Sequence, residues 1–386
     1  MKTDASDDDR LHVGIDCLVV ADRPSGVERA VVGLAEGLAE IAPADQRFSL
    51  MVAAGREDAL PSGEGIAPLA APRWAERRAG RVFYEQALAA TRLRAEQVDV
   101  LHGAAYVLPH NWEGPSVVTV HDAITVCHEQ WCQWHNVIHY GLVMTRSARN
   151  ASAVIVPSEF TKRELVEHVG VQRRQIRVVP LGVGDEFAPA GEDAVERARR
   201  RHGLPERYVL CVGNVEPRKN LTAVVNAFNR VAEETPHGLV IAGKRGWKCG
   251  EICAEMKRSP FSERIRWLGW VPHEDLPALY SGAELFVQWS LHEGFGLTPL
   301  EAMACGTPAV ISDGGALPEI AGDAARVVAL SEGAVGLSGA LVELAGDEDA
   351  RAEMAERGIR HAVRYTWAAH AEAVAQTYRE VAGAQE

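Results

Sequence analysis

Short apolar segments alternate with amphipathic helical patterns along most of the chain. This alternation is typical of α/β domains, in which the strands of a parallel sheet are connected by helices. In the first half, we expect strands at 11–16, 48–53, 98–101, 116–120 and 153–157, and helices near 26–41, 75–96, 132–149 and 159–169. In the second half, we expect strands at 208–213, 238–242, 264–268, 284–289 and 308–312, with helices after Asn220, at Pro299 and at the C-terminal end.

The pattern stops once and starts again, which predicts two Rossmann-like domains. A chain of 386 residues is also longer than one core usually organises. The segment PLGVGDEFAPAGED between the halves is rich in glycine, proline and acidic residues, as linkers are. We predict a disordered tail (1–10), an N-terminal domain (11–185), a linker (186–205), a C-terminal domain (206–365) and a terminal helix (366–386), for which packing against the first domain is one option. Two such sheets would leave a cleft at the carboxyl ends of their strands.

Charge and composition narrow the class of protein. The net charge of −13 argues against a nucleic-acid partner, which would favour a basic surface. No segment approaches the roughly 18 apolar residues needed to span a bilayer, and the acidic start MKTDASDDDR is not a secretory signal. The seven scattered cysteines do not suggest a disulfide framework. We therefore expect a cytoplasmic protein.

The segment LHEGFGLTPLEAMACGTP at 291–308 is the most informative part of the chain. Two carboxylates, Glu293 and Glu301, bracket a glycine-containing loop that opens a short helix. Pro299 suits the first helical position, and Thr298 before it suits the N-cap. The free N–H groups and the dipole of such a helix attract phosphate. An anion site flanked by carboxylates, which accept hydrogen bonds from hydroxyl groups, suits a sugar nucleotide.

A pair of cations in GNVEPRKN is expected at a strand-to-helix turn. Arg218 and Lys219 could neutralise a diphosphate there through charge-assisted hydrogen bonds. The alternative is a solvated basic turn. Together with the glutamate loop, the binding interpretation is favoured.

In the first half, TVHDAIT places His121 and Asp122 just after an expected strand. The histidine could bind a sugar hydroxyl or act as an acid or base, whereas a capping or packing His–Asp pair is the alternative. Gly26, in PSGVERA, could let a substrate approach the backbone. As a lone glycine it is weak support.

Several cysteines and histidines of the first half resemble the ligands of a metal site. Cys127, His128, Cys132, His135 and His139 could be drawn as zinc ligands, but their spacings fit poorly, so we expect no metal. Trp131 and Trp134 nearby are candidates either for packing or for stacking on an acceptor.

Several motifs, taken in order, resemble family 4 of the retaining glycosyltransferases, which have the GT-B fold. They are GNVEPRKNL, LGWVPHEDLPALYSGAELFV, EGFGLTPLEAMACGTPAV and DGGALPEIAGDAA, with looser matches in SGVERA, DVLHGAAYVLP, VTVHD and VPSEFTKREL. The resemblance covers nearly the whole chain. It includes VPLGV as the passage between the domains and Glu293 with Glu301 as the family's spaced pair.

The resemblance also implies roles for individual residues. Arg218 and Lys219 would hold the donor diphosphate, Glu301 the ribose hydroxyls and Glu293 the transferred sugar, which His121 would contact from the other domain. The remaining donor-binding candidates are Gly26, Asn214, Lys244, Val271, Gly294, Phe295, Gly296, Leu297 and Thr298. Asn214 stands near the place where some members carry another phosphate-binding arginine, and Lys244 is a candidate to compensate. Acceptor contacts would involve Asp122, Trp131 and Trp134.

The expected reaction is a metal-independent, retaining transfer of a hexosyl unit from a nucleoside-diphosphate sugar to a hydroxyl of a saccharide, glycolipid or small molecule. It needs no cofactor. Front-face attack is favoured by the resemblance over Glu293 as a covalent nucleophile. A nucleotide-sugar epimerase of the same fold and a non-catalytic nucleotide-sugar-binding protein are the alternatives. The donor base, the acceptor and the oligomeric state stay open.

One segment of the first half bears on membranes. RWAERRAGRVFYEQALAATRLR combines arginines with aromatic residues on an expected helix. It could lie at an anionic lipid surface, or it could be an ordinary amphipathic helix with solvated arginines. The basic residues are Arg73, Arg77, Arg78, Arg81, Arg92 and Arg94. The acidic balance of this half favours the ordinary helix, so peripheral membrane contact is the second option.

Overall fold

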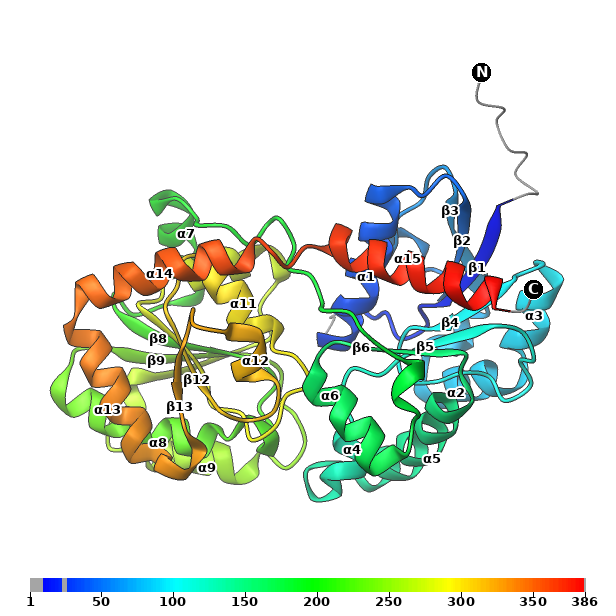
Figure 1. The fold of residues 1–386 in the computed structure, drawn as a ribbon. Coiled ribbons are helices and arrows are strands. Elements are labelled where there is room, and N and C mark those ends of the chain that lie inside the picture. The colour runs from blue at the N-terminus through cyan, green and yellow to red at the C-terminus, as the bar shows by residue number, and fades with distance from the viewer. Residues whose placement is uncertain (1–9, 23–25, 385–386) are drawn as a thin grey trace. The chain divides into compact units, whose positions relative to one another are not determined.

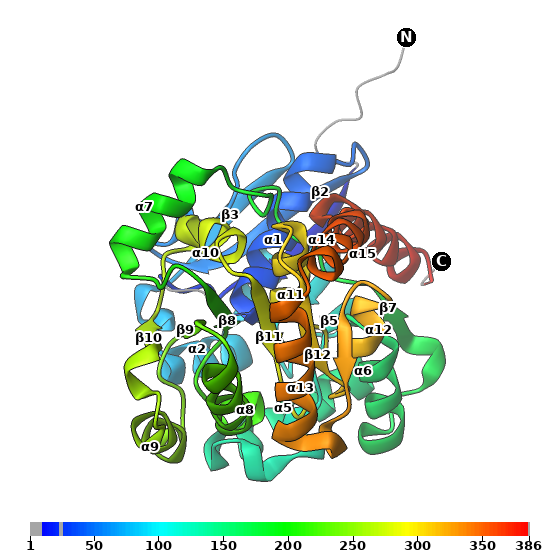
Figure 2. The same ribbon diagram turned by 90° about the vertical axis from the view of Figure 1, so that its left-hand side faces the viewer.

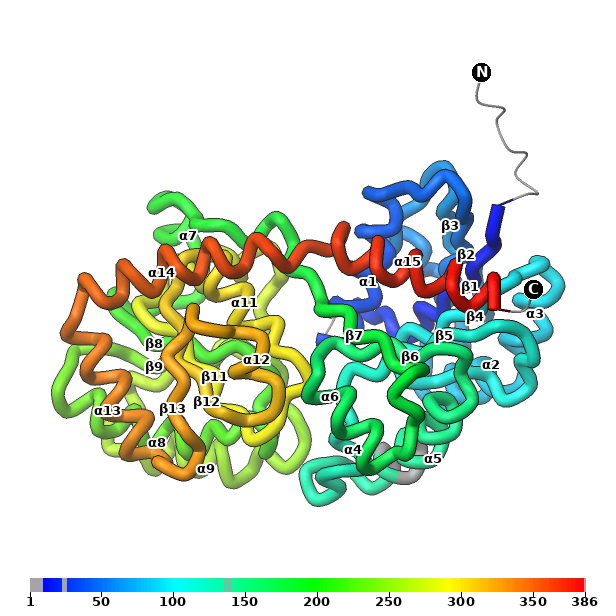
Figure 3. The backbone as a smooth tube through the Cα atoms, viewed as in Figure 1, coloured from blue at the N-terminus to red at the C-terminus, as the bar shows by residue number. Residues whose placement is uncertain are grey.

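The computed structural model describes residues 10–22 and 26–384, apart from the side chains of residues 135, 136, 138 and 139. The chain forms two α/β units (Figure 1). The N-terminal unit extends through Gly182 and takes up the chain again from Thr366, and the C-terminal unit is Val183–Tyr365. Figure 3 follows the chain from one unit into the other and back.

The described part of the N-terminal unit contains a seven-stranded parallel sheet. Its strands are, in spatial order, β3 (Ile66–Ala71), β2 (Gln46–Ala53), β1 (Leu11–Asp16), β4 (Val100–Gly103), β5 (Ser116–Thr119), β6 (Ala153–Val156) and β7 (Ile176–Val178). The chain builds outward from β1 in one direction and then from β4 in the other. The strand order therefore reverses between β1 and β4, where Asp16 aligns with Gly103.

Helices cover this sheet and complete its cores. They are α1 (Gly26–Ile41), α2 (Arg78–Ala87), α3 (Ala89–Ala95), α4 (Ile124–Cys127), α5 (Trp134–Asn150), α6 (Glu159–Glu164), which continues as a π turn to Val169, and α15 (Trp367–Gly383). The central strands β4, β5 and β6 are buried along their whole length. Such continuous burial is expected for a parallel sheet with helices on both faces.

Helix α15 belongs to the N-terminal unit although it ends the chain. Thr366 caps it, because its Oγ1 accepts the N–H of Ala369 at 3.1 Å. On α1, Gly33 and Gly37 make room for Trp367: a Cβ at Gly37 would lie 2.3 Å from the Trp367 carbonyl oxygen. The inner face of α15 joins the core cluster of the sheet through Ala371, Val374, Ala375, Tyr378 and Val381.

The described C-terminal unit contains a six-stranded parallel sheet. Its strands are, in spatial order, β10 (Ile265–Gly269), β9 (Gly238–Ala242), β8 (Tyr208–Val212), β11 (Leu285–Gln288), β12 (Ala309–Ser312) and β13 (Arg326–Val328). Figure 2 shows β10, β9, β8, β11 and β12 from left to right. The order reverses between β8 and β11.

The helices of the C-terminal unit connect these strands and close its core. They are α7 (Glu192–His202), α8 (Leu221–Glu234), α9 (Gly250–Arg258), α10 (Leu276–Ser281), α11 (Leu297–Ala304), α12 (Leu317–Ala321), α13 (Gly333–Gly346) and α14 (Glu348–Ala362). Short 3-10 turns lie at Pro217–Lys219, Ser262–Arg264, His273–Asp275 and Leu330–Glu332. Residues from α8, α13 and the central strands form the main cluster of this core.

The structure confirms the predicted α/β class and differs from the prediction mainly at its edges. Strands β3, β7 and β13 were not expected, and each lies at an edge of its sheet. Pro68 within β3 conceals that strand, since proline interrupts the strand pattern and is tolerated at an edge. The segment 186–205, assigned to a linker from its composition, contains the helix α7.

The helix expected over 75–96 is also divided. It forms a 3-10 turn at Arg73–Glu76, then α2 and α3, which meet at Leu88. Residues 1–9 of the expected tail lie outside the described residues.

Candidate active site

Three loops of the C-terminal unit meet where its strand order reverses. Arg218 and Lys219 follow β8, Glu293 follows β11, and Gly314 and Gly315 follow β12. In open α/β sheets, the carboxyl ends of the strands at such a reversal form the usual ligand site. The two sequence motifs with the strongest chemical signals therefore lie at the expected place for a ligand.

Backbone hydrogen bonds join these loops. The Leu291 N–H donates to the Arg218 carbonyl at 2.8 Å, and the Ala316 N–H donates to the Glu293 carbonyl at 2.8 Å. Gly315 has a φ of +73°, and a Cβ there would lie 2.3 Å from the Glu293 carbonyl oxygen. Glycine is thus required for the loop after β12 to support the Glu293 loop this closely.

The Glu293 carboxylate is the centre of the cluster. Its Oε1 accepts hydrogen bonds from Lys219 Nζ at 2.7 Å, Gln288 Nε2 at 2.8 Å and Ser290 Oγ at 2.7 Å. Its Oε2 forms an ion pair with Arg218 Nη1 at 2.5 Å. Burial alone would raise the pKa of Glu293, but the charges of Arg218 and Lys219 outweigh it and hold the pKa far below its usual range. The group is therefore a firmly ionised carboxylate.

A second buried carboxylate, Glu216, balances the cluster. Its Oε1 accepts hydrogen bonds from Arg218 Nε at 3.2 Å and Nη2 at 2.9 Å. Burial raises the pKa of Glu216, while the neighbouring cations lower it. Two cations thus face two carboxyl groups. No role was predicted for Glu216, although it lies within the same VEPRKN motif.

Helix α11 begins earlier than predicted. Its first residue is Leu297 and its N-cap is Gly296, with a φ of +121° that a glycine adopts readily. The prediction of Thr298 as N-cap and Pro299 as first residue is therefore wrong. The Thr298 hydroxyl instead donates to Gln288 Oε1 at 3.2 Å. Since Pro299 has no N–H, Leu297 and Thr298 supply the first amides of the helix.

Glu301 lies on the same helix and is almost fully buried. Its Oε2 accepts a hydrogen bond from the Tyr280 hydroxyl of α10 at 2.7 Å. This contact fixes the orientation of the carboxylate. Tyr280 was not singled out in the sequence, because a tyrosine in a short apolar helix gives no sign of its partner.

The other donor-binding candidates occupy neighbouring loops. The Val215 N–H donates to the Lys244 carbonyl at 2.9 Å, so the loops containing Asn214 and Lys244 are adjacent. Phe295 is buried against the Tyr365 ring, with 6.0 Å between the ring centroids. Val271 is buried just after β10, and Gly294 lies between Glu293 and Phe295 in the loop. The structure gives the positions of these residues, and their contacts with a donor stay predictions.

His121 lies buried after β5 in the N-terminal unit. Its Nε2 lies 3.0 Å from the Ala104 carbonyl, which can only accept, so Nε2 must donate. Burial lowers the pKa of His121, which favours the neutral ring. Its Nδ1 is then an acceptor, and it has no hydrogen-bond partner among the described residues. The ring is therefore suited to accept a hydrogen bond from a hydroxyl.

The remaining candidates of the N-terminal unit fall into separate environments. Asp122 Oδ1 accepts the Ile124 N–H at 3.3 Å just before α4, whose N-cap is Ala123 and has no side-chain cap. Trp131 stacks on His128 with centroids 4.4 Å apart, whereas Trp134 is 75% exposed. Gly26 starts α1, and a Cβ there would meet no described atom within 4 Å.

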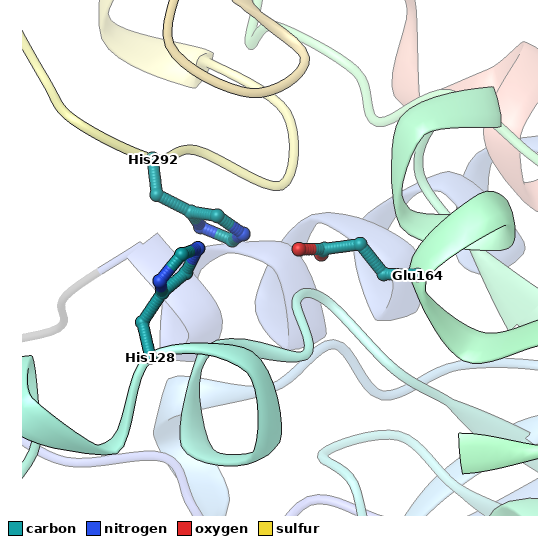
Figure 4. Close-up of side chains that lie close together, drawn as sticks. All are labelled: His128, Glu164 and His292. Atoms are coloured by element: carbon teal, nitrogen blue, oxygen red, sulfur yellow. The ribbon is translucent and has the colours of Figure 1, made fainter. Parts of the chain in front are cut away.

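Of the metal ligands considered in the sequence, the structure describes the side chains of Cys127, His128 and Cys132. Figure 4 shows His128 after α4 and Glu164 at the end of α6, both in the N-terminal unit, and it also labels His292 of the C-terminal unit. His128 and Glu164 offer ligand atoms within 4.8 Å of each other. The side chains of His135 and His139 lie outside the described residues.

Most arginines of the arginine-containing segment are exposed. The exposed residues are Arg73, Arg77, Arg78, Arg92 and Arg94, whereas Arg81 is largely covered and pairs with Glu85. Trp74 and Phe83 beside them are 45% and 58% exposed. Within residues 10–22 and 26–384, no helix has both the length and the apolar character needed to cross a bilayer.

Two family models match the two halves of this chain. Residues 194–361 match the model of the glycosyl transferases group 1, and residues 24–187 match that of glycosyltransferase family 4. The O-antigen chain mannosyltransferase B of Escherichia coli is 30% identical over 271 residues, which are 69% of this chain and 71% of that protein. The D-inositol 3-phosphate glycosyltransferase of Corynebacterium jeikeium is 32% identical over 60% of this chain and 58% of its own length.

Solved structures share the fold. The sucrose-phosphate synthase of Thermosynechococcus elongatus superposes with a TM-score of 0.77 at 22% identity, over 97% of this chain and 100% of its own. Anabaena HepE, solved in complex with UDP and glucose, has a TM-score of 0.74 at 17% identity, over 96% and 100% of the two chains. Two parallel-sheet units of this kind define the GT-B class of fold. Within that class, the chain belongs to glycosyltransferase family 4, also described as group 1, whose members transfer a sugar to an acceptor.

Proposed function

We propose that the protein transfers a hexosyl unit from a nucleoside-diphosphate sugar to a hydroxyl of a saccharide or glycolipid, with retention of configuration and without a metal ion. The observation that carries this proposal is the cluster of Arg218, Lys219 and Glu293 beside the amino end of α11. Names of similar proteins agree with a hexosyl unit, since one relative is a mannosyltransferase and the HepE structure contains glucose.

The charges of the cluster suggest how a donor would enter. Arg218 and Lys219 are paired with Glu293, and Arg218 also with Glu216, so the unliganded cluster is close to neutral. A diphosphate would compete with Glu293 for the two cations. The amides of α11 would add to its attraction. Glu293 would then exchange its cationic partners for hydroxyl groups of the sugar.

The reaction breaks the bond between the anomeric carbon and the diphosphate oxygen and forms a bond from that carbon to the acceptor oxygen on the same face. The leaving phosphate takes the acceptor's proton. Arg218 and Lys219 stabilise the charge that develops on the diphosphate, in the manner of other preorganised donors. Glu293 accepts three hydrogen bonds and an ion pair, and its lowered pKa makes it a weak nucleophile. This supports front-face attack over a covalent intermediate on Glu293.

Thermal shift with UDP, GDP, ADP and dTDP, followed by turnover of the corresponding sugar nucleotides, tests the proposal. A nucleotide that binds the folded protein raises its melting temperature. We expect Lys219→Ala to weaken nucleotide binding and to lower turnover by about 10²–10³-fold, as the loss of one oxyanion donor does elsewhere. Glu293→Gln should lower turnover while nucleotide affinity is kept or increased, because one competitor for the cations is removed.

Matched controls are Lys257→Ala and Glu251→Gln, which change exposed residues of α9. Both should retain wild-type turnover. Near-native turnover in Lys219→Ala and Glu293→Gln would contradict the site assignment. Activity that disappears with a chelator and returns with magnesium would contradict the metal-independent reaction.

A further inference from the structure

Gln288 is a buried polar residue at the carboxyl end of β11. It is the one polar residue of the strand, whose sequence is LFVQ, and its side chain is almost fully buried. A buried amide destabilises the folded state unless its groups are hydrogen-bonded. Gln288 was not among the site residues expected from the sequence, and the steps of the proposed reaction do not use it.

The amide of Gln288 contacts three polar side chains of the candidate site. Its Nε2 donates to Glu293 Oε1 at 2.8 Å and to Ser290 Oγ at 3.1 Å, and its Oε1 accepts from the Thr298 hydroxyl at 3.2 Å. The ionised Glu293 can only accept, so the amide nitrogen must face it and the amide oxygen must face Thr298. The Ser290 hydroxyl in turn donates to Glu293 Oε1 at 2.7 Å. The partners therefore determine the orientation of the amide.

The two oxygens of Glu293 are held by different kinds of donor. Oε1 accepts from the neutral groups of Gln288 and Ser290 as well as from Lys219. Among the described residues, Oε2 is held by Arg218 alone, at 2.5 Å. In the proposed function, a diphosphate attracts Arg218 and Lys219 away from Glu293. Oε1 would then keep two neutral donors, whereas Oε2 would lose its partner and become available to a sugar hydroxyl.

We propose that Gln288 is a positioning residue, which with Ser290 holds Oε1 of Glu293 so that Oε2 faces a hydroxyl of the transferred sugar. A carboxylate held only by the two cations would lose its orientation when they bind the diphosphate. Thr298 connects the Gln288 amide to the first turn of α11, which supplies the amides proposed to attract the same diphosphate. The inference deepens the proposed function and rests on it.

Binding without an acceptor tests this role separately from transfer. Calorimetric titration compares UDP with UDP-glucose and GDP with GDP-mannose, and the ratio of the two affinities in each pair measures the contacts of the sugar. Gln288→Met keeps approximately the length of the side chain and removes its hydrogen bonds. We expect this variant to retain its affinity for the nucleoside diphosphate and to bind the sugar nucleotide about tenfold more weakly. The matched control is Asn226→Met, because Asn226 is an exposed amide residue of α8.

A pH profile of Gln288→Glu distinguishes positioning from a merely structural role. The carboxyl group introduced there can donate to Glu293 when it is protonated, and it repels Glu293 when it is ionised. We therefore expect turnover about 10–100-fold below the wild type near about pH 8, with recovery as the pH falls. The wild-type amide does not titrate, and the charged neighbours Arg218, Lys219 and Glu216 are common to both proteins. Asn226→Asp is the control and should follow the wild type.

Three results would overturn the inference. They are unchanged sugar-nucleotide affinity in Gln288→Met, an equal loss of affinity for the nucleotide and its sugar derivative, and a loss of turnover in Gln288→Glu that does not depend on pH. If Gln288→Glu does not fold, the titrations of Gln288→Met decide. Selective loss of sugar-nucleotide affinity in Gln288→Met, together with no transfer by the wild type, would contradict the proposed function and support this inference. No binding of either sugar nucleotide by the wild type would contradict both.

Discussion

Replacement of His102 should make the N-terminal unit less sensitive to acid. His102 is fully buried on β4, where its Nδ1 lies 2.7 Å from the Tyr378 hydroxyl of α15 and its Nε2 lies 2.8 Å from Thr119 Oγ1. Burial, and then the neighbouring His370 and His121, lower the pKa of His102 from 6.5 to about 3. The folded protein therefore keeps this ring neutral across the mildly acidic range.

The unfolded chain binds the proton first as the pH falls. Its histidine pKa stays near 6.5, so the contribution of His102 to stability is complete above that pH and decreases as the pH approaches 3. Between pH 7 and 4.5 this amounts to about 2.5 kcal/mol. This free-energy difference holds for any pKa of His102 in the folded protein that is well below 4.5. It is a substantial part of the 5–15 kcal/mol that stabilises a typical domain.

The difference between two proteins isolates this contribution. Other groups titrate in the same range, and some act in the opposite direction: the pKa of Asp16 is raised to about 6, so its burial favours the folded state as the pH falls. Urea unfolding of wild type and His102→Gln at pH 7 and at pH 4.5 removes these shared effects. We expect the wild type to lose about 2.5 kcal/mol more than the variant between the two pH values.

The control is His110→Gln, which changes an exposed histidine of the same unit. It should follow the wild type. If His102→Gln loses as much stability as the wild type between pH 7 and 4.5, the ring accepts a proton in the folded protein. The burial argument, and with it the docking of α15 through Tyr378, would then be wrong.

Three further predictions concern close contacts and the surface. Gly37→Ala should lower the melting temperature, measured by calorimetry, because its Cβ would lie 2.3 Å from the Trp367 carbonyl oxygen, and overpacking costs about 1–3 kcal/mol; an unchanged value would contradict the packing of α15. Gly315→Ala should abolish turnover with the melting of the N-terminal unit unchanged, since it displaces the Glu293 backbone; normal kinetics would contradict the loop arrangement. In flotation with anionic vesicles at physiological salt, we expect the protein to stay unbound, because Arg81 is paired with Glu85 and the net charge of −13 opposes an anionic surface; co-flotation that depends on Trp74 would show the opposite.

The sequence predicts the central strands well because their signal is local. Runs such as Gly238–Ala242 are continuously apolar, and in the structure each of their residues is buried. Edge strands depend instead on a neighbour for half of their hydrogen bonds and for their burial. The strand Ile66–Ala71 contains Pro68 and lies at an edge, so only the assembled sheet identifies it.

The candidate site, too, could be predicted only in part from the sequence. The types and order of Arg218, Lys219 and Glu293 can be recognised in the sequence, but their mutual pairing at 2.5–2.7 Å depends on two strands that are far apart in the chain. The sequence therefore gives separate roles to groups that the structure places in one cluster. Asp16 is the acidic residue of strand β1, which is otherwise apolar apart from His12. Its neighbour Glu85 comes from a helix whose orientation the hydrophobic pattern does not determine.

The two strand-order reversals use the same topology with different charge. In the C-terminal unit, two cations and a helix amino end surround carboxylates that a diphosphate can displace. In the N-terminal unit, two carboxyl groups share one arginine, and burial favours their protonated forms. The proposed site of the C-terminal unit would thus attract an anionic group despite the net charge of −13 on the whole chain. The local arrangement of a few buried groups, and not the overall charge, would decide which ligand such a site favours, because buried charges are screened far less than those on the surface.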